Sequence, residues 1–170
     1  MWWFKVLGAA ALLVAGGLCG CFQPLYGEAA HPGLVADLRA IEVAPIANRV
    51  GHYLGEDLIA DLNGTGQTAS PPKYRLTVTV SLGTQTPTVN SEINAASSAT
   101  MTGDATYTLI RIDGGAEVLK GNASVAAAYD RTTQRYSDLR SARDAEIRIA
   151  RALSEEISLR LASAIAAKSS

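Results

Sequence analysis

The 170-residue chain has few of the residues that usually build catalytic and metal sites. It contains two cysteines and two histidines, and both cysteines lie within its first 21 residues. His31 and His52 stand apart from each other and from any HExxH or His-x-His pattern, so the usual ligand spacing of a zinc site is missing. GxSxG and phosphate-loop motifs are missing too. The sequence therefore predicts a protein that is not an enzyme and that needs no cofactor.

An excess of basic charge is also missing. Fifteen Lys and Arg residues stand against sixteen Asp and Glu residues, which gives a net charge of −1. Proteins that bind nucleic acid usually carry a basic surplus, so we expect no nucleic-acid partner. The composition, 48% hydrophobic and 18% charged, is ordinary for one compact domain with its own core.

The N-terminus differs from the rest of the chain. A single Lys5 precedes an apolar run from Val6 to Leu18 that contains no charge. This layout is typical of a secretory signal peptide. The run is shorter than the about 20 apolar residues that a membrane-spanning helix needs. We therefore expect residues 1–20 to be a signal peptide that is removed.

The end of this segment resembles the bacterial lipobox. In the stretch Leu18-Cys19-Gly20-Cys21, a leucine stands three positions before Cys21 and a small residue directly before it. A Cys-x-Cys metal or redox site would need further ligands, and the sequence has no other cysteine. We expect Cys21 to carry a diacylglycerol and an acylated amino group, which together anchor the protein to a membrane without spanning it. Modification of Cys19 is the alternative.

Composition divides the mature chain into a lipidated tether, residues 21–37, and a single folded domain, residues 38–168. The stretch 22–33 has two prolines, two glycines and no hydrophobic periodicity, which is typical of an irregular segment. Periodicity within the domain predicts a strand in 38–46, a helix over 48–64, a strand over 73–83, a long exposed connection over 84–99, strands over 100–112 and 117–129, and a C-terminal helix.

The last two strands flank Asp113-Gly114-Gly115, a hairpin signal because glycine accepts a positive φ. A three-residue turn would pair Thr108 with Lys120. The apolar alternation slips near Leu109 and Ile110 and again near Leu119, which indicates bulges or shifts of register in this hairpin. The inward-facing candidates of this hairpin are Ala105, Tyr107 and Leu109, followed by Val118 or Leu119, and Val125.

The C-terminal helix is predicted from a capping box at Ser141 and Asp144 and from an apolar stripe. The stripe consists of Ile147, Ala150, Leu153, Ile157, Leu161, Ala164 and Ile165. Two amphipathic helices and a sheet with one apolar face form a two-layer sandwich. The predicted fold is α+β, with the order β-α-β-β-β-α and a mostly antiparallel sheet covered on one face by two helices.

The stretch from Cys21 to Gly27, CFQPLYG, follows the lipobox directly and precedes this small domain. The arrangement resembles the lipopolysaccharide (LPS) assembly lipoprotein family LptE, in its alphaproteobacterial form. Residues 128–165 resemble the usual ending of that family, an aromatic strand end, a polar turn and a helix. The resemblance implies an outer-membrane lipoprotein that sits as a plug in the β-barrel translocon LptD, helps LptD to fold and supports insertion of LPS into the outer leaflet.

Phe22 stands where enteric relatives that stay at the inner membrane have Asp, so the resemblance also implies sorting to the outer membrane. Alternation sends Lys73 and Arg75 to the polar side of the sheet, and Lys120 lies beside Thr108. These three cations are our candidates for contact with LPS phosphates, because charged donors bind phosphate well. The alternative is that they only solubilise the protein. The alternative functions are a scaffold or binding lipoprotein of another envelope complex and, as a third class, an envelope hydrolase.

Overall fold

The computed structural model describes residues 33–64, 71–86 and 98–169. The predicted signal peptide, Cys21 and most of the tether therefore lie outside the described residues. In chain order the elements are α2 (Leu34–Arg39), β1 (Ile41–Val43), α3 (Asn48–Asn63), β2 (Tyr74–Gln85), β3 (Ser98–Arg111), β4 (Glu117–Asp130) and α4 (Arg135–Ser169).

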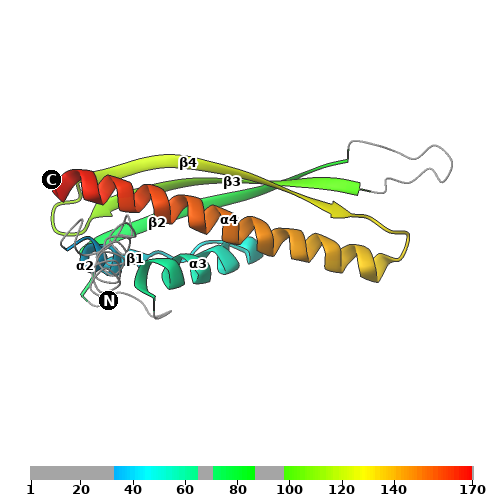
Figure 1. The fold of residues 1–170 in the computed structure, drawn as a ribbon, viewed down its shortest axis with the longest axis horizontal. Coiled ribbons are helices and arrows are strands. Elements are labelled where there is room, and N and C mark those ends of the chain that lie inside the picture. The colour runs from blue at the N-terminus through cyan, green and yellow to red at the C-terminus, as the bar shows by residue number, and fades with distance from the viewer. Residues whose placement is uncertain (1–32, 65–70, 87–97, 170) are drawn as a thin grey trace, which may run out of the picture.

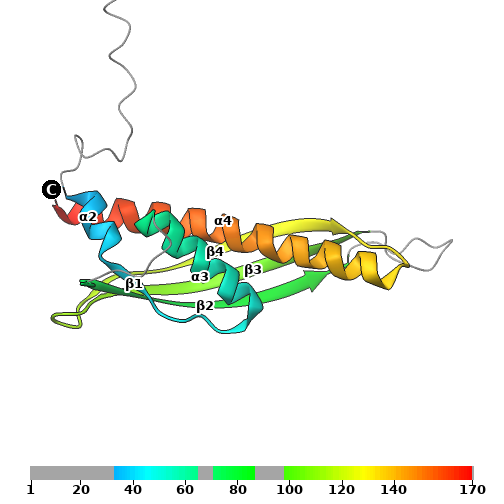
Figure 2. The same ribbon diagram turned by 90° about the horizontal axis from the view of Figure 1, so that it is seen from below.

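The structure is the predicted two-layer α+β sandwich. Its four strands lie in the order β1-β2-β3-β4, with β1 parallel to β2 and the other neighbours antiparallel. The helices cover one face of the sheet, and the described elements leave the other face uncovered (Figures 1 and 2). The molecule is elongated along α4, which runs beside the three long strands.

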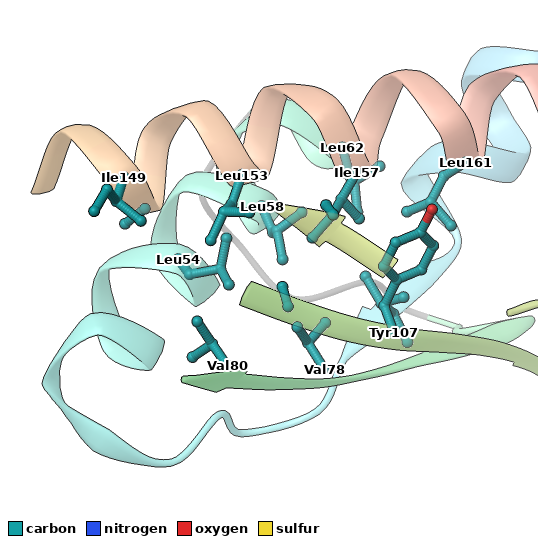
Figure 3. Close-up of a cluster of buried hydrophobic side chains, with 14 of the residues drawn as sticks. Leu54, Leu58, Leu62, Val78, Val80, Tyr107, Ile149, Leu153, Ile157 and Leu161 are labelled. Carbon is teal, nitrogen blue, oxygen red and sulfur yellow. The ribbon is translucent and has the colours of Figure 1, made fainter. Parts of the chain in front are cut away.

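The core lies between the sheet and the pair α3 and α4 (Figure 3). Helix α4 packs mainly against α3 and over β4 and β3, while α3 lies nearest to β1 and β2. The side chains that we expected to meet, Leu76, Val78 and Val80 from the sheet and Leu153, Ile157 and Leu161 from the last helix, all belong to this one buried cluster. The alternation of β2 thus buries one face and leaves the other to polar residues.

The predicted pairing of Thr108 with Lys120 is confirmed. Thr108 of β3 lies opposite Lys120 of β4, and the register shifts between Leu109 and Ile110, where the sequence indicated a bulge. Ala105, Tyr107 and Leu109 are all buried. The helix predicted over 48–64 is α3, which ends with Gly64 in the left-handed conformation at φ 66°.

Two details of the last helix were predicted wrongly. Helix α4 begins at Arg135, so Ser141 lies inside the helix and does not cap it. An ion pair between Arg131 and Asp138, 3.6 Å apart, joins the approach to the helix to its first turn. Ile147 is 38% exposed, and the fully buried Ile149 takes its expected place in the core.

Helix α2 was not predicted. Its Leu34 is only 1% exposed and belongs to the core, and α2 packs against α4 and α3. A helix of six residues is too short to show a clear hydrophobic period in the sequence. The expected connection over 84–99 is shorter in the structure because β2 extends to Gln85 and β3 begins at Ser98.

Candidate functional site

Two of the three predicted LPS-contact cations, Lys73 and Arg75, already have acidic partners within the fold. The Lys73 ammonium donates a hydrogen bond to Oδ1 of Asp37 at 2.8 Å, and this bond raises the pKa of Lys73 above its ordinary value. The Arg75 Nε donates to Oε2 of Glu42 at 3.2 Å. Asp37 lies in α2 and Glu42 in β1, so both cations are tied to the N-terminal elements at one end of the sheet.

The third cation, Lys120, is exposed on β4. In the sheet it shares a cross-strand row with Thr108 of β3 and Thr77 of β2. Arg75 belongs to a different row, opposite Ile110. The structure therefore places Lys73 directly before β2, near Arg75 on that strand, and Lys120 two strands away on β4.

Short polar side chains dominate the outer face of the sheet around these cations. The hydroxyl of Ser124 donates to Oδ1 of Asp104 at 2.7 Å across β4 and β3. Further exposed polar residues on this face are Thr77, Thr79, Ser81, Thr106 and Asn122. Hydroxyl and amide groups both donate and accept hydrogen bonds, so this face suits a polar partner such as a saccharide or a protein surface.

A cavity of about 390 Å³ lies at the α2 end of the sheet, on the side of the helices. Tyr74 and Arg111, which are cross-strand partners, form part of its wall, and the Arg111 guanidinium carbon lies 6.0 Å from the centre of the Tyr74 ring. Ile165 and Lys168 of α4 line the other side. Sequence reasoning missed Arg111 and Lys168 because no local motif marks them, and only the fold brings these elements together.

Acidic, histidine and cysteine side chains do not gather into a metal site within the described ranges, where no group of three such residues could hold an ion. The described helices also include none that is long and apolar enough to cross a membrane.

Comparison with protein-family models and with curated protein sequences gives no match. Solved structures do match. A Caulobacter crescentus protein described as a lipoprotein shares 27% identity with this chain at a TM-score of 0.65, and the match covers 81% of this chain and 96% of the other. This chain therefore has a fold that is found in bacterial lipoproteins.

Two further lipoprotein structures support the fold alone. Rare lipoprotein B from Shewanella oneidensis shares 12% identity at a TM-score of 0.53, covering 72% of this chain and 93% of the other. A minor lipoprotein from Acinetobacter baumannii shares 10% identity at a TM-score of 0.53, covering 74% of this chain and 92% of the other. The 27% identical structure is the one that supports an envelope lipoprotein.

Proposed function

We propose that the chain is a non-catalytic outer-membrane lipoprotein that associates with an LptD-like β-barrel as its plug and assembly partner and supports insertion of LPS into the outer leaflet. The observation that carries this proposal is the fold shared with a lipoprotein at 27% identity over 81% of the chain. The lipobox that ends at Cys21 supplies the membrane anchor, and the CFQPLYG stretch gives the resemblance to the LPS-assembly family.

The shape of the molecule supports a role as a partner inside a larger protein. A narrow, elongated sandwich presents its uncovered polar sheet face over the full length of β2, β3 and β4 (Figure 2). A face rich in hydroxyl groups is compatible with the polar inner wall of a large barrel, because the interiors of such barrels are themselves polar.

The test is co-purification of the tagged, lipidated chain from detergent-solubilised outer membranes. Recovery of a large outer-membrane β-barrel in stoichiometric amount supports the proposal. Recovery of an inner-membrane transporter instead supports the alternative function, a scaffold or binding lipoprotein of another envelope complex. Fractionation of the lipidated chain to the inner membrane would contradict the proposed location.

We also propose that Lys73, Arg75 and Lys120 contact the phosphorylated sugars of LPS. The ammonium group of Lys120 forms no ion pair or hydrogen bond within the described ranges and lies beside threonines. Lys73 and Arg75 would exchange Asp37 and Glu42 for phosphate, which charged donors bind well.

This contact is tested by replacing all three cations with Glu and measuring LPS binding in vitro. We expect weaker binding, with an unchanged circular dichroism spectrum and unchanged co-purification of the barrel. The single variant Lys120→Glu leaves the Lys73–Asp37 and Arg75–Glu42 ion pairs intact and serves as the matched control for folding. Unchanged LPS binding by the folded triple variant would rule these residues out.

A further inference from the structure

The first turns of α4 extend beyond α3. Helix α4 has 35 residues and α3 has 16, and α3 begins near the middle of α4 (Figures 1 and 2). The side of α4 that α3 covers farther along the helix is therefore without a helical neighbour at its start. This end of the molecule lies opposite the end that holds α2 and the C-terminus (Figure 1).

A groove of about 300 Å³ occupies this position. We call it the arginine groove, and its lining residues are Arg49, Tyr136, Leu139, Arg140, Ala142, Arg143 and Glu146. Tyr136 is 75% exposed and Leu139 is 60% exposed, the two largest values among the exposed large hydrophobic residues of the described chain. Residues three and four positions apart are neighbours on a helix surface, so Tyr136 lies beside Leu139 and Arg140, and Arg143 lies one turn farther along beside both of these.

The groove has more positive than negative groups. Arg49 holds the carboxylate of Glu146 through two hydrogen bonds, from Nε at 2.8 Å and from Nη2 at 2.6 Å. The side chain of Glu146 is only 11% exposed, and Arg49 neutralises its charge within the fold. Arg140 and Arg143 are exposed, and neither guanidinium group forms an ion pair or a hydrogen bond with any other described residue. Two guanidinium groups thus remain unmatched beside two exposed apolar side chains.

We propose that the arginine groove binds an acidic segment of a partner protein, whose carboxylates pair with Arg140 and Arg143 while an apolar side chain packs between Tyr136 and Leu139. A guanidinium group matches a carboxylate through two parallel hydrogen bonds, as Arg49 and Glu146 already do in the same groove. Tyrosine and arginine are also the residues that contribute most at protein interfaces.

The shape of the site favours a peptide over a membrane surface. A groove with Ala142 and Glu146 along its wall accepts an inserted side chain, whereas a bilayer surface contacts protruding residues. Helix α4 is about 50 Å long. The groove lies at one end of α4, and α2, with which the described chain begins, lies at the other end. The experiment below has to distinguish this peptide from the competing occupant, a lipid surface.

The experiment places a photo-reactive phenylalanine analogue at position 136 of the full-length, lipidated chain in living cells. After irradiation, mass spectrometry maps the cross-linked peptide. We expect cross-links to one protein, in a segment that contains Asp or Glu. The same analogue at Leu159, which is 52% exposed on the same helix, is the positional control and should not link to that segment.

The charge dependence is tested with Arg140→Glu combined with Arg143→Glu, which should lower the cross-link yield at least about tenfold because two charge-assisted pairs are lost. The control Arg39→Glu with Arg151→Glu changes the net charge equally at two exposed positions outside the groove and should leave the yield unchanged. If the Glu variant folds poorly by circular dichroism, the same two positions are changed to Gln. The proposal is overturned by a yield that does not depend on the arginines, by a mapped segment without acidic residues, by links only to phospholipid or LPS, or by no protein link above the Leu159 control.

Discussion

Gly103 of β3 lies directly beneath a side chain of α4. A Cβ atom at this position would lie 2.3 Å from Cγ2 of Ile149 and 3.4 Å from the nearest methyl groups of Leu153 and Leu82. Ile149 points from α4 into the buried cluster (Figure 3). Because a β-branched side chain in a helix has one strongly preferred rotamer, Cγ2 of Ile149 cannot turn aside without moving α4. Gly103→Ala is therefore expected to push the helix away from the sheet.

The expected cost of Gly103→Ala is a difference of two terms. Overpacking a core typically costs about 1–3 kcal/mol. Replacing glycine with alanine in a strand recovers about 0.5–1 kcal/mol, because alanine loses less conformational freedom on folding. We expect the free energy of unfolding to fall by about 1–2 kcal/mol, which corresponds to about 2–4 °C in Tm for each kcal/mol in a protein of this size.

Urea unfolding followed by circular dichroism measures this loss in four proteins: wild type, Gly103→Ala, Ile149→Ala and the double variant. The added methyl group of Ala at position 103 fills part of the space left by Ile149→Ala, so the double variant should lose less than the sum of the two single losses. Gly83→Ala is the matched control, since its Cβ would meet only the Thr102 hydroxyl, at 3.0 Å in an exposed part of β2. Strictly additive losses, or a Gly103→Ala protein as stable as wild type, would refute the close-packing argument.

Three further predictions concern the core, the pH dependence of stability and the anchor. Ile157→Ala should cost about 2–5 kcal/mol by urea unfolding, because Ile157 is fully buried between α4 and the sheet; an unchanged Tm would contradict this. Burial raises the pKa of Asp57, so the folded state keeps this proton more tightly than the unfolded state. The stability of wild type relative to Asp57→Asn should therefore fall as the pH rises from the ordinary aspartate pKa of about 3.9 through the raised pKa, and equal pH profiles would refute it. Mass spectrometry of the mature N-terminus should find an acylated Cys21, and a mature chain that starts at Cys19 would show that the other cysteine is modified.

The sequence predicted the sheet well because its signals are local. Strand alternation depends on neighbouring residues, and the Asp113-Gly114-Gly115 turn determines which residues of β3 and β4 face each other. The pairing of Thr108 with Lys120 agrees with the three-residue turn of the prediction, although β3 ends at Arg111, β4 begins at Glu117 and the register shifts between Leu109 and Ile110. The bulge at Leu109 follows from a break in the alternation that is visible in the sequence.

The start and the buried face of α4 were harder to predict. Its buried row repeats every four residues, at Ala145, Ile149, Leu153, Ile157, Leu161 and Ile165. Each such step drifts by about 40° around a helix of 3.6 residues per turn, so the row winds around α4 as the helix crosses a twisted sheet. A straight stripe drawn through Ala150 and Leu153 therefore reaches Ile147 and misses Ile149. The capping box at Ser141 failed because the residues before it, from Arg135 onward, continue the helix without a glycine or proline.

The candidate site could be predicted only in part. Alternation placed Lys120 on the exposed side of the sheet, where the structure has it. It could not reveal that Asp37 and Glu42 neutralise Lys73 and Arg75, because this depends on the unpredicted helix α2 and on the parallel register of β1. The arginine groove was equally invisible, since Arg49 and Glu146 lie far apart in the sequence and meet only when α3 packs on α4.

The edge of the sheet at β4 limits how a partner can bind. Three cationic side chains of α4 donate hydrogen bonds to backbone carbonyls of this strand: Arg148 to Ala128 at 2.9 Å, Arg160 to Asn122 at 2.6 Å and Lys168 to Val118 at 3.2 Å. Carbonyls that accept from α4 are less available to an added strand, and an exposed edge strand otherwise invites such pairing. We therefore expect a partner at this side of the molecule to bind through side chains on the uncovered face and in the arginine groove, since pairing a strand with β4 would first have to displace three side chains of α4.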